Sequence, residues 1–176
     1  MIICVIGSGG REDAICKSIY NSPKVKKIFC LPGNAGTQEV AENVDLNIDD
    51  HDALIKFLKK SKVDLVIVGP EKPLVNGIAD VLENNHIKVF GPRKVPSQLE
   101  GSKTFTKELC KKYNIPTAKF GVFETVNETL NFLKKSNFPI VIKADGLAAG
   151  KGVYISKNFK DSENAVKEIF GGKFGN

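Results

Sequence analysis

The sequence predicts an α/β protein whose N-terminal part forms a doubly wound parallel sheet. Short apolar runs alternate with stretches of helical length, and the loops between them are short, which is typical of strand–helix–strand units. Glycine and proline cluster after four of these segments, at residues 7–10, 32–36, 69–73 and 91–92. Because the carboxyl ends of parallel strands meet at one edge of a sheet, we expect these clusters to surround one crevice.

Each strand of this sheet is predicted from an apolar run. The run "IICVIG" ends in glycine, as a buried parallel strand would, and "VDLVIVGP" is the clearest run of this kind. In "VDLNID" the apolar residues alternate, which predicts a short edge strand. The predicted strands therefore cover residues 2–7, 26–31, 44–49, 63–70 and 87–92.

The helices between the strands are predicted from spacing and capping. A first helix is expected over residues 11–21. Apolar residues recur at helical spacing after Asp50 and Asp52, either of which could cap the helix there. They recur again at every fourth position within residues 73–85, which predicts an amphipathic helix.

A second part, of α+β type, is expected to begin near residue 100. Its predicted strands, at residues 119–123, 139–143 and 152–156, are expected to be antiparallel. The chain ends in "FGGKFGN" without a closing element, so we expect it to be the first part of a longer polypeptide. Helices are predicted over residues 95–100, 102–114, 126–136 and 161–170.

The composition excludes several classes of protein. The net charge is +6, but the lysines are spread over separate helices without interleaved aromatic residues, so we expect no nucleic-acid partner. No apolar run reaches the length of a membrane span, and the first strand starts at Ile2, which leaves no room for a signal peptide. Cys4 and Cys30 lie in apolar runs and no CxxC pair occurs, which predicts reduced, buried thiols and a cytoplasmic protein.

The turn "GSGGRE" after the first strand is the first candidate site. Gly7 and Gly9 fit a dinucleotide-binding turn, but the third glycine position holds Glu12, and "LP" stands where the second strand should end in an acidic residue. What remains is a glycine turn at a helix N-terminus, which suits a single phosphate beside Arg11, although Gly9 and Gly10 could simply allow a tight turn. Arg11 and Arg93 each follow a glycine-containing turn, from which a guanidinium can reach an anion bidentately.

Two further groups are expected at the same crevice. Glu71 lies between Pro70 and Pro73, where a rigid loop could aim its carboxylate at sugar hydroxyls. Alternatively, Glu71 only favours the start of the following helix. Asn34, in "LPGNAGT", is a weaker candidate for the rim.

The stretch "VIKADGLAAGKGV" is the second candidate site. Lys143 ends an apolar strand, where a cation needs a partner, and Lys151 lies among glycines in the loop that follows. Backbone N–H groups and ammonium groups around such a loop suit the phosphates of ATP. The loop differs from a P-loop because Val153 stands where Ser or Thr is needed. Lys103, in "EGSKTF", is a third candidate cation, although any one of these lysines could be merely solvated.

Taken together, these motifs resemble the phosphoribosylamine–glycine ligases (glycinamide ribonucleotide synthetases), a family of ATP-grasp enzymes in purine biosynthesis. The resemblance covers the whole chain. It implies a pre-ATP-grasp, Rossmann-like substrate-binding domain at residues 1–100, and the start of an ATP-grasp domain with its glycine-rich lid at residues 101–176. The implied reaction joins glycine to phosphoribosylamine through an acyl phosphate, with ATP cleaved to ADP and phosphate. The motifs are "VIGSGGRE", "PGNAGT", "VGPEKPLVNGI", "FGP", "LEGSKTFTK" and "PIVIKADGLAAGKGV".

The resemblance also implies site residues. The Mg²⁺ or Mn²⁺ ligands and the rest of the enzyme would lie in the remainder of the same polypeptide, so we expect no metal ligands here and no ligation by this chain alone. The sequence departs from the family pattern at Asp13, where the family usually has histidine. The negative charge of Asp13 is expected to weaken the binding of a phosphate at the neighbouring turn. Phosphoribosylamine would be bound by Gly9, Gly10, Arg11, Asn34 and Glu71, and ATP by Lys103, Lys143, Asp145, Gly146, Gly150, Lys151 and Gly152.

Other functions stay open at this point. The chain could be a non-catalytic module that binds a ribonucleotide phosphate. It could also belong to another ATP-grasp carboxylate–amine ligase of purine synthesis, although "GPEKPLVNG" and "ADGLAAGKGV" argue against that. An NAD-dependent dehydrogenase is the least favoured alternative.

Overall fold

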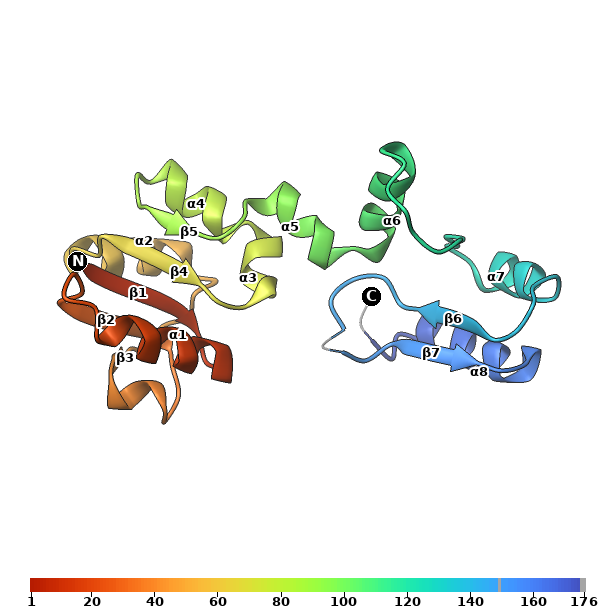
Figure 1. The fold of residues 1–176 in the computed structure, drawn as a ribbon, viewed down its shortest axis with the longest axis horizontal. Helices are drawn as coiled ribbons and strands as arrows, with labels where there is room; N and C mark the ends of the chain where they lie inside the picture. The colour runs from red at the N-terminus through yellow and green to blue at the C-terminus, as the bar shows by residue number, and fades with distance from the viewer. Residues whose placement is uncertain (149, 175–176) are drawn as a thin grey trace. The chain divides into compact units, whose positions relative to one another are not determined.

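The computed structural model describes residues 1–148 and 150–174, and the chain divides into two compact units. The N-terminal unit is Met1–Gly101 and the C-terminal unit is Ser102–Asn176. Each unit has its own sheet (Figure 1).

The N-terminal unit is built on a five-stranded parallel sheet with strand order β3-β2-β1-β4-β5. The central strand β1 pairs with β2 on one side and with β4 on the other. The prediction of an α/β fold with a parallel sheet is therefore confirmed. The strands are β1 (Ile2–Gly7), β2 (Lys27–Pro32), β3 (Glu42–Asn43), β4 (Leu65–Val68) and β5 (Val89–Phe90).

Helices cover both faces of this sheet (Figure 1). Successive residues of β1 point to opposite faces, so Cys4 and Ile6 pack in the core shared with α2 and α4, whereas Ile3 and Val5 pack on the side of α1. This two-sided burial explains why β1 is apolar throughout. The helical segments are α1 (Gly10–Tyr20), the 3-10 helix η1 (Thr37–Glu39), α2 (His51–Lys60), α3 (Glu71–Asn76), α4 (Ile78–Asn84) and α5 (Lys94–Gly101).

The cysteines of the N-terminal unit lie in these cores. Cys4, Cys16 and Cys30 are free thiols that are fully buried, which confirms the predicted burial of Cys4 and Cys30. Burial, and to a lesser degree the neighbouring Cys30, raises the pKa of Cys4 to about 12. Cys4 is therefore a neutral, unreactive thiol that packs as a small apolar side chain.

Two predicted elements of the N-terminal unit are wrong in detail. The edge strand lies at Glu42–Asn43 and not at residues 44–49. The apolar side chains of residues 44–49 pack on the core. Of these residues Val44 continues the strand pairing, since its N–H donates to Cys30 O at 2.9 Å. The helix predicted over residues 73–85 is two helices, because Gly77 has a φ of +98° and ends α3. A left-handed residue cannot continue a right-handed helix, and glycine adopts that conformation without strain.

The C-terminal unit contains one antiparallel pair of strands, β6 (Ile140–Lys143) and β7 (Val153–Ser156). In the described part of this unit the strand predicted at residues 119–123 does not form. Phe123 of this segment instead packs on Phe132 of α7, with ring centroids 4.8 Å apart. This apolar side chain therefore packs against a helix and not within a sheet. The helices are α6 (Lys103–Lys112), α7 (Val126–Leu133) and α8 (Phe159–Phe170).

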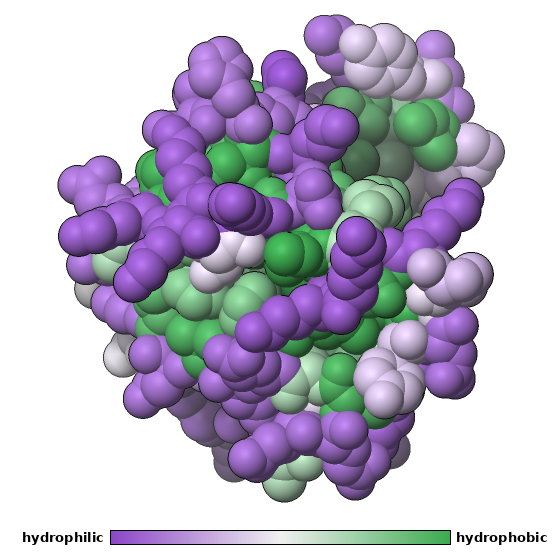
Figure 2. All heavy atoms as spheres, turned by 90° about the vertical axis from the view of Figure 1, so that its left-hand side faces the viewer, coloured by the Kyte–Doolittle hydropathy of each residue, from purple (hydrophilic) through white to green (hydrophobic). Residues whose placement is uncertain are grey.

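The surface carries hydrophilic side chains throughout one side of the molecule, with hydrophobic residues visible between them (Figure 2). This arrangement is expected where long charged side chains lie along apolar surface with their charged ends in water. Among the residues that the structure describes, no helix is both long enough and apolar enough to cross a membrane.

Asp50 is the N-cap of α2, as one of the two sequence alternatives predicted. Its Oδ1 accepts a hydrogen bond from Ala53 N–H at 3.0 Å. We expect Asp50→Ala to lower the free energy of unfolding by about 1 kcal/mol, because a helix N–H loses its acceptor. Urea unfolding followed by circular dichroism measures this change. Asp49→Ala, at an exposed position just before the cap, is the control and should change little; an equal loss in both variants would contradict the capping role.

Candidate functional site

The turn between β1 and α1 presents Gly9, Gly10 and Arg11 at the carboxyl edge of the sheet. Gly9 is the N-cap of α1, and its N–H donates to Glu12 Oε2 at 2.6 Å. A Cβ on Gly10 would meet no atom within 4 Å, so the space beside this residue is open. Arg11 extends from the first turn of α1 with 64% of its side chain exposed. Open backbone and an exposed guanidinium together suit an anion.

Arg11 and Glu71 come together although they are far apart in the sequence. Arg11 Nη1 lies 3.7 Å from Glu71 Oε2 and donates to Gly69 O at 2.5 Å. Glu71 starts α3 directly after β4 and is 44% exposed, so its carboxylate is accessible. The residues predicted to bind a phosphate and a sugar therefore lie side by side within one unit, as the sequence predicted for loops at the ends of neighbouring strands.

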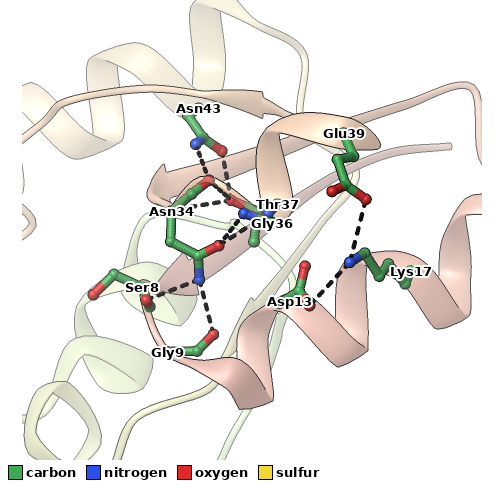
Figure 3. A network of polar contacts seen from close by, with 9 residues as sticks. All are labelled: Ser8, Gly9, Asp13, Lys17, Asn34, Gly36, Thr37, Glu39 and Asn43. Atoms are coloured by element: carbon green, nitrogen blue, oxygen red, sulfur yellow. Dashed lines mark hydrogen bonds and ion pairs between the residues drawn. The ribbon is translucent and has the colours of Figure 1, made fainter.

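The side chain of Asn34, a predicted substrate-binding residue, is bonded to backbone groups in this structure (Figure 3). Its Nδ2 donates to Ser8 O at 2.9 Å and to Gly9 O at 3.1 Å. Its Oδ1 accepts from the N–H groups of Gly36 and Thr37, at 2.7 and 3.0 Å. Asn34 thus ties the loop after β2 to the β1–α1 turn, so it can hold a binding loop in place while its own amide is occupied.

Asp13 belongs to an ion network between α1 and η1 (Figure 3). Lys17 Nζ lies 3.2 Å from Asp13 Oδ2 and 3.3 Å from Glu39 Oε2. Hydrogen bonds to Asp13 and then to Glu39 raise the pKa of Lys17 above its ordinary value. Lys17 therefore offsets the charge that Asp13 adds. The other carboxylate oxygen, Asp13 Oδ1, is buried against Gly36 without a hydrogen-bond partner in the described part of the chain.

In the C-terminal unit, Asp145 joins the end of β6 to the start of α6. Its Oδ1 accepts from Lys103 N–H at 2.6 Å and its Oδ2 from the Ser102 hydroxyl at 2.9 Å. Lys103 Nζ donates to Gly146 O at 2.8 Å. Three of the predicted ATP-binding residues, Lys103, Asp145 and Gly146, are thereby in direct contact, and Lys103 has an ammonium group at the root of the glycine loop.

The carboxyl group of Asp145 stays ionised to lower pH than usual. Burial tends to raise its pKa, but hydrogen bonds from the Ser102 hydroxyl and from backbone N–H groups outweigh that effect and hold the pKa below its ordinary value. The folded state therefore binds this proton less tightly than the unfolded state does. The resulting stability is present above the ordinary pKa and is lost as the pH falls below about 4.

We expect Asp145→Asn to destabilise the C-terminal unit at pH 7 and to have a smaller effect at pH 3, where this carboxyl group is protonated in the unfolded chain and the extra stability of the folded state is being lost. Thermal unfolding at both pH values measures the difference. Glu124→Gln, an exposed carboxylate of the same unit, is the control and should change neither curve. An equal destabilisation by Asp145→Asn at both pH values would show that the charge of Asp145 is irrelevant.

The loop between β6 and β7 requires glycine at three positions. Gly146, Gly150 and Gly152 have φ values of +85°, +77° and +73°, which other residues adopt only with strain. Around Gly146 and Gly150 an added Cβ would meet nothing, so backbone groups are open to a ligand there. Lys151 is exposed between the last two glycines, and its N–H donates to Ala148 O at 2.8 Å. Residue 149 of this loop lies outside the described residues.

Lys143 is not the buried cation that its apolar strand suggested. It is exposed on the same face of β6 as Val141, which is itself 50% exposed. The opposite face of β6 packs toward α8, so only every second residue is covered. In the described part of the chain no protein group pairs with Lys143, and its ammonium group is free to meet an anion.

Some residues that shape these sites were missed by sequence reasoning. Glu12 was noted only as a misfit to a dinucleotide motif, yet its carboxylate binds the turn that precedes it; a Glu three residues after the N-cap was the available signal. Ser102 was not singled out, although it caps α6 and bonds to Asp145. Arg93 was noted as a possible anion ligand, but its Nε pairs with Glu83 Oε2 at 2.5 Å. Within residues 1–148 and 150–174, no group of three His, Cys, Asp or Glu side chains could hold a metal ion.

Comparison with known proteins defines first the class and then the family. Residues 101–176 match the family described as "Phosphoribosylglycinamide synthetase, ATP-grasp (A) domain", and residues 1–100 match its "N domain". The fold also superimposes, with a TM-score of 0.75 and 19% identity, on N5-carboxyaminoimidazole ribonucleotide synthetase from Thermus thermophilus, over 96% of this chain and 44% of that one. The chain is thus of the ATP-grasp class. It belongs to the phosphoribosylglycinamide synthetase family.

More similar relatives carry the name of one enzyme. Phosphoribosylamine–glycine ligase from Brucella melitensis is 47% identical over 99% of this chain and 41% of its own length. The crystal structure of phosphoribosylamine–glycine ligase from Thermotoga maritima is 34% identical, with a TM-score of 0.77 over 97% of this chain and 40% of that chain. The chain thus spans about two fifths of the length of the relatives that it matches.

Proposed function

We propose that this chain forms the ribonucleotide-binding unit and part of the ATP-binding region of a phosphoribosylamine–glycine ligase. The observation that carries the proposal is the pair Arg11 and Glu71, which lie 3.7 Å apart, both accessible, beside an open glycine turn. The ligation itself is proposed for the whole protein, since this chain covers 41% of the length of the Brucella melitensis relative.

The N-terminal unit would bind the ribose phosphate of phosphoribosylamine. Backbone N–H groups at the start of α1 and the guanidinium of Arg11 would hold the 5′-phosphate. Glu71 would accept hydrogen bonds from ribose hydroxyl groups, which requires that Arg11 turn from the carboxylate toward the phosphate. The 3.7 Å separation and the exposure of both side chains support such a rearrangement, because an exposed ion pair costs little to break.

The C-terminal unit would bind the phosphates of ATP. The open glycines of the β6–β7 loop, Gly146 and Gly150, offer backbone N–H groups, and Lys143 and Lys151 are accessible cations. Gly152, with its positive φ, would allow the turn from the loop into β7. Asp145 would hold the first residues of the loop against the start of α6, where Lys103 lies. Cations at these places would offset charge that develops during phosphoryl transfer.

The proposed reaction needs no nucleophile from the protein. The carboxylate of glycine attacks the γ-phosphorus of ATP, which releases ADP and leaves an acyl phosphate. The amine of phosphoribosylamine then attacks the acyl carbon, and phosphate leaves as the amide forms. The residues of this chain would orient substrates and neutralise charge. The carboxylates of the described residues do not form a site that fits Mg²⁺, so no step is assigned to a metal here.

Calorimetric titration with glycinamide ribonucleotide, the stable product, tests the proposal. We expect saturable binding to the 176-residue chain and about 10- to 100-fold weaker binding to Glu71→Ala, because a carboxylate that accepts sugar hydroxyls is lost. Glu83→Ala is the matched control, since Glu83 forms a similar exposed ion pair with Arg93 in the same unit. Absence of binding to the folded wild-type chain, or equal losses in the two variants, would overturn the assignment.

A further inference from the structure

Glu12 carries a carboxylate that the binding turn encloses. The residue is 4% exposed, in the first turn of α1, and its Oε2 accepts a hydrogen bond from Gly9 N–H at 2.6 Å. Burying a carboxylate costs free energy unless the carboxylate is hydrogen-bonded. The bond to Gly9 N–H therefore fixes both the Glu12 side chain and the backbone of the turn. The bond also withdraws the Gly9 N–H from any ligand.

Three glycines leave the space that Glu12 fills. A Cβ on Gly7 would lie 2.6 Å from Glu12 Cδ, and one on Gly9 would lie 3.0 Å from Glu12 Oε2. The closest approach is at Gly69, where a Cβ would lie 2.0 Å from Glu12 Oε1. Gly7 and Gly9 belong to the β1–α1 turn, but Gly69 follows β4. Glu12 therefore bridges two loops that lie on neighbouring strands.

Gly69 is held from three directions at this point. Its N–H donates to Ile6 O at 3.0 Å, and its carbonyl accepts from Arg11 Nη1 at 2.5 Å. Its Cα faces the Glu12 carboxylate, and Glu71 follows two residues later. Gly69 lacks a positive φ, so it is the contact with Glu12, and not the backbone conformation, that a larger residue would disturb, because the buried Glu12 side chain would have to move.

We propose that the contact between Glu12 and Gly69 is a positioning device that sets the spacing between Arg11 and Glu71, and so the spacing between the phosphate and sugar groups of the ligand. Arg11 adjoins Glu12 in α1, and Glu71 begins α3 directly after the short loop that Gly69 anchors, so a shift of either loop moves one group relative to the other. Glu12 itself is a positioning residue and does not touch the ligand. The inference rests on the proposed function for the identity of the ligand.

A suppressor experiment in the 176-residue chain tests this device, with glycinamide ribonucleotide as the probe. We expect Gly69→Ala to weaken binding at least 10-fold, since the added Cβ overlaps Glu12. Glu12→Ala should also weaken binding, because the loop loses its support. In the double variant the overlapping atoms are gone, so binding should be no weaker than in Glu12→Ala alone. Independent effects would multiply instead, and that result would overturn the proposal.

Glu12→Gln separates position from charge. Glutamine keeps the shape and an oxygen that can accept from Gly9 N–H, so binding should stay within about 3-fold of wild type. Binding as weak as in Glu12→Ala would show that the charge, and not the placement of the loop, is what matters. Asp50→Ala removes a capping carboxylate of α2 away from this contact and should lower the melting temperature without changing affinity. A matching loss of affinity in Asp50→Ala would attribute all the effects to general destabilisation.

The same variants remain informative if the wild-type chain does not bind the probe. In that case the proposed function fails, and the contact is judged from melting temperatures. We expect Glu12→Ala to cost less stability in the Gly69→Ala background than in wild type, because it relieves the overlap. Additive shifts would overturn the contact itself.

Discussion

Replacing Arg11 with alanine is expected to weaken the binding of glycinamide ribonucleotide by about 10- to 100-fold. A guanidinium that forms charge-assisted hydrogen bonds to a phosphate contributes about 1.5–3 kcal/mol, which corresponds to this range. Stability should change by less than about 0.5 kcal/mol, because the side chain is 64% exposed and its ion pair with Glu71 is long. Calorimetric titration and urea unfolding of the same variant measure the two effects.

Lys56→Ala is the matched control for Arg11→Ala. Lys56 is exposed on α2, so its replacement removes the same formal charge from another helix of the same unit. We expect its affinity to equal that of wild type. If the two variants weakened binding equally, the net charge of the unit would explain the effect and Arg11 would have no specific role.

Leu54→Ala is expected to cost about 2–5 kcal/mol of unfolding free energy, the largest stability change among these predictions. Leu54 is fully buried on α2 and belongs to the core that includes Ile6 and Val66 of the central strands. Truncation leaves a cavity, because the surrounding strands are fixed by pairing on both sides and cannot close around it. Urea unfolding followed by circular dichroism measures the loss.

Val95→Ala is the control for burial. Val95 is apolar as well, but it is 69% exposed on α5. Its truncation removes little buried surface, so the free energy of unfolding should change by less than about 0.5 kcal/mol. Comparable losses in Leu54→Ala and Val95→Ala would contradict the assignment of the core.

The fold was predicted most completely where the local signal and the packing agree. The apolar run at Ile2–Gly7 is buried on both faces of the sheet, so the strand itself follows from composition alone, whereas its central place in the sheet came only from the structure. The strand predicted at residues 119–123 failed because an extended apolar segment needs a partner strand, whereas Phe123 found an aromatic partner on α7. Gly77 broke a helix that apolar spacing alone would have continued.

The candidate sites were predicted only in part, for a related reason. Residue types and glycine spacing marked Arg11, Glu71 and the β6–β7 loop, because anions, sugars and open backbone have recognisable chemical requirements. The sequence did not indicate that the Asn34 amide is already bonded to the β1–α1 turn, or that Lys143 stands on an open face of β6. Both facts depend on which groups the fold brings near.

By itself, then, the sequence determined the class of fold, the loops that meet at the carboxyl edge of the sheet, and the residue types of the two candidate sites. Only the tertiary structure decided which groups are free to bind and which are occupied. Gly69 lies 58 residues from Arg11, and Asp145 lies 42 residues from Lys103, yet each pair shares a hydrogen bond. Hydrogen-bond partners that distant are chosen by the packing of whole elements, which no local pattern of residues records.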